Sequence, residues 1–303
     1  MDFKYKLTEE TRNEGSRKLH RVRALRDIPR HGLNAGDLGG WIETESNLAQ
    51  EGDCWVADDA VVEGRAVVSG DALIAGNARV GNYSVITDRG RIRDNAIVWG
   101  LVTVEGDAVV EGNASLERGA RVGDHATITG HARIGGHAFV GGRSVVDGTA
   151  HIRDGASIRG SARVAGQATV GGSAHLTGKA TVCEDATVEG MSTIVGNAHI
   201  SDSAEITETA HYLTAGPVGP ENVSVTLYRT RSGHAVQVGC WGPGSIDAFR
   251  AEAVRLEQVE WANKDPIEVV RWVAQCAHLL KLADDIVASW DEERTKTKLS
   301  TRA

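Results

Sequence analysis

An aliphatic residue recurs at every sixth position over half of the chain. From Val56 to Ile206, all 26 of these positions hold Val, Ile or Leu, and the residue two places earlier is Ala at 20 of them. Two places after the aliphatic residue, the chain has Gly at 16 positions and Asp at 6. A period of six fits neither the helical turn of about 3.6 residues nor a simple alternation along a strand. This repeat therefore constrains the fold more than local propensity does.

Each repeat unit, as in HATITG or SARVAG, predicts a short strand followed by a corner. The Ala and the aliphatic residue point inward, and the Gly or Asp adopts the positive φ that the corner requires. Three consecutive units, with three strands and three corners, form one triangular coil, so the 26 units form between eight and nine coils. At about 4.8 Å per coil, the shaft is roughly 40 Å long. So thin a core agrees with an aromatic content of only 5%.

The repeat resembles that of the hexapeptide-repeat proteins over residues 54–212. This resemblance implies a mainly β fold, the left-handed parallel β-helix, which is a triangular solenoid. The left hand rests on the resemblance alone, because crossover connections between parallel strands are otherwise right-handed. A solenoid supports many functions, so the fold by itself does not assign one.

The segments that flank the repeat differ from it in composition. Alternating residues near Leu19 predict two or three strands that cap the first coil, because an open β-helix end leaves backbone groups unpaired. After the repeat we expect a β-hairpin that turns at Arg231-Ser-Gly, a helix capped by Ser245 and a second helix that begins at Pro266. The predicted units are an N-terminal β cap (1–50), the β-helix (51–212), a linker (213–223), a C-terminal hairpin with helices over 246–262 and 266–293 (224–293), and a disordered tail (294–303).

Both ends of the chain are also similar to a narrower group, the β-helix proteins encoded by phages and prophages. In those proteins a head such as LHRVRALRDI, AGDLGGWIE and EGDCWV precedes the hexapeptide repeats. A Gly-Cys-aromatic segment followed by Asp-x-Phe recurs near their end, here Gly239-Cys240-Trp241 and Asp247-Ala-Phe249. The resemblance implies a phage or prophage source.

Charge and composition exclude several classes of partner. The net charge of −8 argues against a protein that coats nucleic acid or a membrane surface. No run of 18 apolar residues and no secretion signal occurs, so we expect a soluble protein in the cytoplasm of a bacterial cell. The four cysteines have unrelated spacings, which favours reduced thiols and no metal site.

The resemblance to hexapeptide-repeat proteins implies one enzymatic alternative, a homotrimeric acyltransferase that uses acetyl-CoA. Its active sites lie between subunits and need a His as general base. The candidates for this base are His125, His131, His137 and His151. The first three follow successive corners of one coil and point to three edges, so they cannot share a metal ion within one chain. Against this alternative, no inserted loop interrupts the 26 units to build a substrate pocket.

Arginine is concentrated in the middle of the shaft. Seven Arg and three Asp lie between 118 and 163, whereas acidic residues outnumber basic residues by seven over 51–117 and by five over 164–211. The stacking of successive coils places Arg133 over His151, with Arg153 on the same face. This basic band, with Arg159, predicts a site for a small anionic ligand. The alternative is that the arginines only solubilise the sheets.

Several outward positions of the first coils are apolar. Trp55, Leu73, Val109 and Val145 fall on one face of the predicted shaft. Monomers seldom expose such a surface. Either the terminal segments fold over it or it is an oligomer interface, and the resemblance favours a homotrimer.

These observations favour a phage-derived, non-enzymatic binding or scaffold protein that acts inside bacteria, with the acyltransferase as the alternative. In the favoured interpretation the chain has no catalytic residue and no cofactor, and it inhibits or sequesters a host component such as a defence protein. The residues predicted to contact this partner lie in the head: Arg21, Arg23, Arg26, Asp37 and Trp41.

Overall fold

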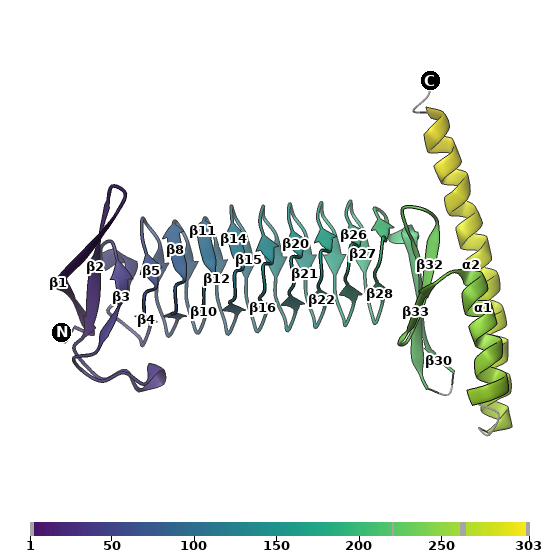
Figure 1. The fold of residues 1–303 in the computed structure, drawn as a ribbon, viewed down its shortest axis with the longest axis horizontal. Helices are drawn as coiled ribbons and strands as arrows, with labels where there is room; N and C mark the ends of the chain where they lie inside the picture. Colours follow the sequence, from purple (N-terminus) through teal and green to yellow (C-terminus); the bar gives the residue numbers. More distant parts are fainter. Residues whose placement is uncertain (1–2, 220, 261–264, 301–303) are drawn as a thin grey trace.

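The repeat winds into a long shaft of parallel strands, with a small β cap at one end and a sheet with two helices at the other (Figure 1). The computed structural model describes residues 3–219, 221–260 and 265–300. Along the shaft, each strand pairs in parallel with the strand three repeat units further on, as Arg133 pairs with His151. The mainly β, parallel solenoid of about nine turns that the repeat predicts is confirmed.

Three parallel sheets form the three faces of the shaft. Face 1 contains β5 (Val61–Val62), β8 (Arg79–Asn82), β11 (Ile97–Gly100), β14 (Ser115–Glu117), β17 (Arg133–Ile134), β20 (His151–Ile152), β23 (Thr169–Val170), β26 (Thr187–Val188) and β29 (Glu205–Ile206). Face 2 contains β4 (Trp55–Val56), β7 (Leu73–Ile74), β10 (Arg91–Ile92), β13 (Val109–Val110), β16 (Thr127–Ile128), β19 (Val145–Val146), β22 (Arg163–Val164), β25 (Thr181–Val182) and β28 (His199–Ile200). Face 3 contains β6 (Val67–Val68), β9 (Val85–Ile86), β12 (Thr103–Val104), β15 (Arg121–Val122), β18 (Phe139–Val140), β21 (Ser157–Ile158), β24 (His175–Leu176) and β27 (Thr193–Ile194).

The core of the shaft is a column of stacked aliphatic side chains. Every aliphatic residue of the six-residue repeat is at most 1% exposed, and the Ala residues two places earlier are buried with them. Ile134 lies directly opposite Ile152 of the next coil. Burial of one such side chain stabilises the fold by about 1.5–3 kcal/mol.

The corners of the shaft have the left-handed backbone that the repeat predicts. Gly142 has a φ of 70° and Asp124, at the equivalent corner one coil earlier, has a φ of 56°. The Asp124 carboxylate accepts a hydrogen bond of 2.7 Å from the Gly142 backbone amide. An acidic corner residue therefore ties its own coil to the next.

The N-terminal cap extends face 1 beyond the first coil. β1 (Tyr5–Glu14) and β2 (Arg17–Ala24) are antiparallel, β2 pairs with β3 (Leu38–Ile42), and β3 pairs in parallel with β5. The short 3₁₀ helix η1 (Pro29–His31) lies between β2 and β3, and a second one, η2 (Glu45–Asn47), lies between β3 and the first strand of the shaft. A Cβ at Gly39 would lie 2.6 Å from the Trp55 ring, so the glycine lets β3 lie against this ring. Trp55 is fully buried, so the terminal segment covers at least this part of the apolar surface.

The C-terminal module is an antiparallel sheet covered by helices. Its strands are β30 (Tyr212–Val218), β31 (Val223–Arg229), β32 (His234–Val238) and β33 (Trp241–Gly244), preceded by η3 (Thr209–His211). α1 (Ile246–Arg255) continues as one π-helical segment, η4 (Leu256–Glu260), and α2 spans Pro266–Ser300. In Figure 1 the long α2 lies across the end of the shaft and extends past the sheet.

Several local predictions for this module are confirmed and others are wrong. The hairpin turns between Arg229 and His234 as expected, and the Ser245 hydroxyl accepts a hydrogen bond of 3.1 Å from the Ala248 amide. The segment 213–223 is not a linker, because most of it forms β30 and pairs with β31. The first helix changes to π geometry after Arg255, and its predicted end at 262 lies outside the described residues.

The tail predicted to be disordered from residue 294 is helical to Ser300. The physical reason is that the last turns of α2 are anchored on the sheet. The Arg294 guanidinium donates to the backbone carbonyls of Thr230 and Gly233, and the Trp290 indole donates to the Ala210 carbonyl at 3.0 Å. Residues 301–303 lie outside the described residues.

All four cysteines are free thiols in the structure. Of the helices in the described part of the chain, none has both the length and the apolar character needed to span a bilayer.

Candidate functional site

An open concavity of about 390 Å³ lies on face 1, in the middle of the shaft. Its lining residues are His131, Arg133, Thr149 and His151. Arg133 on β17 pairs in register with His151 on β20, and His131 and Thr149 occupy the positions two residues before them. The stacking of two successive coils therefore arranges four polar side chains in a two-by-two array. The predicted juxtaposition of Arg133 and His151 is present.

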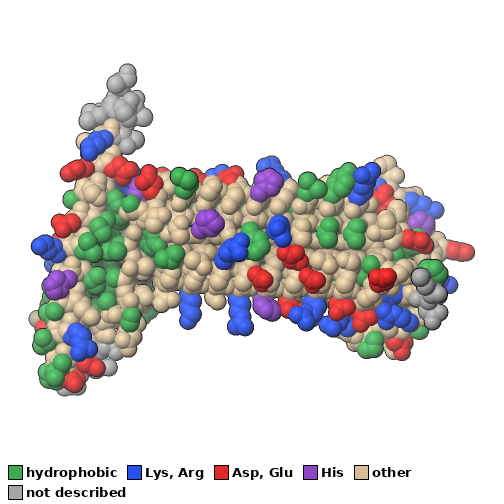
Figure 2. Space-filling model, turned by 180° about the vertical axis from the view of Figure 1, so that it is seen from behind, with side chains coloured by type: hydrophobic (Ala, Val, Ile, Leu, Met, Phe, Trp, Pro, Cys, Tyr) green, Lys and Arg blue, Asp and Glu red, His purple; other side chains and the backbone are tan. Residues whose placement is uncertain are grey.

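Arg133 is the cation of this array. Some arginines of the basic band are neutralised, since Arg121 forms an ion pair with Glu105 and Arg163 with Asp147. Among the described residues, no carboxylate forms an ion pair with Arg133. An uncompensated guanidinium beside two imidazoles can bind an anion with charge-assisted hydrogen bonds. Figure 2 shows that Lys, Arg and His side chains project from the surface along the shaft.

Two residues of the predicted ligand site do not join this array. Arg153 follows β20, but its guanidinium pairs with Asp154 at 3.1 Å and also with Glu189. Arg159 follows β21 on face 3, where its guanidinium carbon lies 4.3 Å from the centre of the Phe139 ring. Arg153 is thus on face 1 but neutralised by carboxylates, whereas Arg159 lies on a different face from Arg133.

The four histidines considered as a general base divide into two groups. His131 and His151 line the concavity. His125 precedes β16 on face 2, with its Nδ1 3.4 Å from an Asp107 carboxylate oxygen. His137 precedes β18 on face 3 and lies over Gly119, where a Cβ would come within 2.7 Å of its Nδ1. The three corner histidines thus point to three faces, and among the described residues no group of three metal-ligating side chains converges.

A Cys–His pair on face 2 is not predicted by the sequence pattern. The Cys183 Sγ lies 3.6 Å from the His199 Nε2, because the residues are 16 apart and so occupy adjacent coils on face 2. Burial raises the pKa of the Cys183 thiol and lowers the pKa of His199. Both shifts favour the neutral thiol and the neutral imidazole, so this pair lacks the thiolate that nucleophilic catalysis needs.

The head residues predicted to contact a partner are mostly engaged within the cap. Trp41 is buried, with the Arg21 guanidinium carbon 5.5 Å from its ring centre, and the Arg21 Nε donates to the Gly39 carbonyl at 3.0 Å. Arg26 forms an ion pair with Asp53 at 3.0 Å, and an Asp37 carboxylate oxygen accepts a hydrogen bond from the Asn34 amide. Arg23 is exposed on β2.

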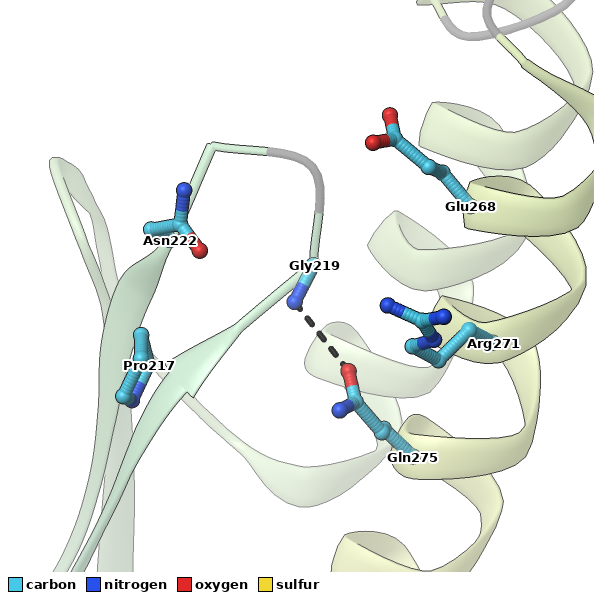
Figure 3. Close-up of a pocket in the computed structure, with 6 residues that line it drawn as sticks. All are labelled: Pro217, Gly219, Asn222, Glu268, Arg271 and Gln275. Carbon is cyan, nitrogen blue, oxygen red and sulfur yellow. Dashed lines mark hydrogen bonds between the residues drawn. The ribbon is translucent and has the colours of Figure 1, made fainter.

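The C-terminal module contains several cavities, of which two are large enough or polar enough to be considered as sites. One, of about 310 Å³, is lined mainly by apolar and aromatic side chains, including Trp241, Phe249 and Trp272. The other, of about 180 Å³, lies between the β30–β31 loop and α2 and is polar (Figure 3). In Figure 3, Arg271 lies between Glu268 and Gln275 on α2, and the Gln275 side chain accepts a hydrogen bond of 3.2 Å from the Gly219 amide. This bond ties the helix to the loop.

Part of the chain is similar to a known protein. No family model matches the chain. The chain is similar to the uncharacterized acetyltransferase YdcK of Escherichia coli (strain K12), with 32% identity over 108 residues. The match covers 33% of this chain and 27% of the relative, so the chain spans about a quarter of the length of the curated relative that it matches. The relative and the parallel solenoid both fit a hexapeptide-repeat β-helix.

Proposed function

We propose that the protein is an acyltransferase that moves an acetyl group from acetyl-CoA to an amine or hydroxyl acceptor at the concavity on face 1. The observation that carries the proposal is Arg133, a guanidinium without an ion pair among the described residues, beside His131 and His151. The similarity to a protein described as an acetyltransferase supports the reaction class.

Each residue of the array has a role in this reaction. Arg133 holds a phosphate of acetyl-CoA, because a guanidinium binds phosphate oxygens through two parallel hydrogen bonds. One imidazole, from His131 or His151, takes the proton of the acceptor as the acceptor attacks the thioester carbonyl. The carbon–sulfur bond then breaks, and the CoA thiolate leaves and takes up a proton. The Thr149 hydroxyl donates to the Gly166 carbonyl at 3.2 Å, and its oxygen can accept a hydrogen bond that orients either substrate.

All four lining residues come from one face of a single chain. A face of one solenoid forms one wall of a site, so this proposal includes a second subunit that supplies the opposite wall. The homotrimer implied by the hexapeptide-repeat resemblance provides this arrangement.

The first test is native mass spectrometry of the purified protein with and without acetyl-CoA. We expect a trimer that gains three CoA-sized adducts, and acetyl transfer when amine or sugar acceptors are added. Arg133→Gln is expected to weaken acetyl-CoA binding at least tenfold. His131→Gln and His151→Gln, made separately, are expected to leave binding intact, and one of them is expected to abolish turnover.

Arg143→Gln is the matched control. Arg143 lies in the same basic band, is exposed, and is outside the concavity. Its replacement removes the same charge, so equal losses of binding in the two arginine variants would contradict a site at Arg133. Normal turnover in both histidine variants would contradict the assignment of the base.

The uninterrupted repeat favours a second candidate, the phage-derived scaffold that binds an anionic ligand or a host protein without turnover. No loop is inserted between the shaft strands from β4 to β29 to enclose a substrate. Binding of an anion at Arg133 without acetyl transfer to any acceptor, together with a co-purifying host protein, would support this candidate over the enzyme.

A further inference from the structure

Lys4, just before β1, is buried against the first coil. It is 0% exposed, as is Cys54, which precedes β4. The Lys4 amine donates a hydrogen bond of 2.8 Å to the Cys54 carbonyl and lies 3.0 Å from the Cys54 sulfur. The backbone is fixed as well, since the Lys4 amide donates to the Gln50 side chain at 2.8 Å. The amine and the thiol are therefore held in contact.

Lysine is rarely buried without an acidic partner, because burial of an unpaired ammonium is costly. Within the described part of the chain, no carboxylate forms an ion pair with Lys4. Burial lowers the pKa of this amine, which increases its neutral, nucleophilic form. The cap thus places an amine in contact with an oxidisable sulfur.

We propose that Lys4 and Cys54 form a covalent modification site, in which hydrogen peroxide joins the lysine nitrogen to the cysteine sulfur. In the first step the thiol displaces water from peroxide and becomes a sulfenic acid, so sulfur loses two electrons and peroxide is reduced to water. In the second step the neutral amine attacks this sulfur, a nitrogen–sulfur bond forms, and the sulfur–oxygen bond breaks. The hydroxyl leaves with the amine proton as a second water. The site takes up no oxygen and loses two hydrogens in total.

The bond has a definite structural effect, because it links the start of the edge strand β1 to the first coil. Phe3, next to Lys4, is exposed, so in this proposal peroxide reaches the thiol when the start of this edge strand opens locally. Once formed, the link holds the cap over Trp55 and the end of the core. Thiol reductants reverse it by attacking the sulfur.

The test is peroxide treatment of the full-length protein, followed by alkylation of free thiols, trypsin digestion without reductant and mass spectrometry. Trypsin does not cleave after a modified Lys4. We expect the peptide that contains Lys4 and ends at Lys6 to be joined to the peptide 31–65, with a mass two hydrogens below the sum of the two. Treatment with dithiothreitol should restore both peptides.

Cys54→Ser is the first control, because it keeps a small buried side chain but removes the sulfur, so no joined peptide is expected. Lys4→Met is the second, because it keeps the length of the side chain but removes the amine, and in this variant Cys54 oxidation should stop at oxygen acids. Circular dichroism establishes that each variant is folded. Cys240, which is exposed, reports in the same digest that the oxidant was active.

Three results would overturn the proposal. One is a wild-type digest in which Cys240 is oxidised and Cys54 remains a free thiol. Another is Cys54 recovered as a sulfinic or sulfonic acid with no joined peptide. The third is a joined peptide that retains an oxygen atom, which would exclude the condensation step.

Discussion

Replacement of Gly160 by Ala is expected to destabilise the shaft more than replacement by the larger Asp. Gly160 occupies a corner with a φ of 70°, and a Cβ there would lie 2.8 Å from both the amide nitrogen and the carbonyl oxygen of Gly178 in the next coil. A left-handed backbone costs an L-residue about 1–2 kcal/mol. Because both close contacts are with backbone atoms, a change of side-chain rotamer cannot relieve them.

Aspartate has a compensation that alanine lacks. At the natural corners the Asp124 carboxylate accepts the Gly142 amide at 2.7 Å, and the Asp94 carboxylate accepts the Gly112 amide at 2.9 Å. A carboxylate at position 160 would accept the Gly178 amide in the same way. Such a bond to a charged but exposed acceptor contributes about 1 kcal/mol. We therefore expect a loss of about 1–2 kcal/mol for Gly160→Ala and of less than about 1 kcal/mol for Gly160→Asp.

Urea and thermal unfolding followed by circular dichroism measure this difference. A change of 1 kcal/mol corresponds to a shift of about 2–4 °C in the melting temperature for a unit of this size. Gly155→Ala is the matched control, because Gly155 has no left-handed φ and a Cβ there would meet its nearest neighbour, the Gly172 carbonyl, at 3.4 Å. If Gly160→Ala were as stable as Gly160→Asp, or if Gly155→Ala cost as much, the reasoning would be refuted.

Three further predictions concern the core of the shaft, the junction of the N-terminal cap with the shaft, and the C-terminal module. Ile134→Ala removes a fully buried side chain from the column and is expected to cost about 2–5 kcal/mol in urea unfolding, and a loss below about 1 kcal/mol would contradict close packing. Glu63→Gln removes a buried carboxylate that lies 2.9 Å from the guanidinium groups of both Arg17 and Arg79. We expect the free energy of unfolding to fall by about 1–3 kcal/mol, measured as a lower melting temperature. Burial, together with the positive charge of Arg229, lowers the pKa of His211 in the folded protein. Near the usual His pKa of about 6.5, the unfolded chain therefore binds more protons than the folded chain. Stability of the C-terminal module should therefore fall as the pH drops below about 6.5, and an unchanged melting temperature between about pH 7.5 and pH 5.5 would contradict this.

The shaft was predictable because one rule sets every position in it. An inward aliphatic residue at every sixth place fixes the strand, the corner and the pairing between successive coils, so the contact between Arg133 and His151 follows from counting. The same count also contained the contact between Cys183 and His199. This contact is harder to predict because the two residues are diagonal neighbours, 16 residues apart, whereas the repeat directly aligns residues one full coil of 18 apart.

The ends of the chain were less predictable because their structure depends on contacts between distant residues. The segment 213–223 has prolines and glycines typical of a linker, but its backbone is paired along β31. The polar end of α2 is held by Arg294 against two carbonyls of the hairpin, which lie far earlier in the chain. Arg and Trp are residue types typical of binding surfaces, but in this structure Arg21 and Trp41 pack against each other inside the cap. Charge and aromatic content do not reveal which partner a side chain will find.

The number of repeat units in the shaft determines both the distance and the relative orientation of the cap and the C-terminal module. Each coil contributes a rise of about 4.8 Å, and each six-residue unit contributes one third of a turn. Removal of one whole coil from the middle would bring the cap and the C-terminal module closer together and leave their relative orientation unchanged. Removal of a single unit would instead rotate one by a third of a revolution against the other. The number of units, counted modulo three, therefore determines which direction the C-terminal helices face relative to the cap.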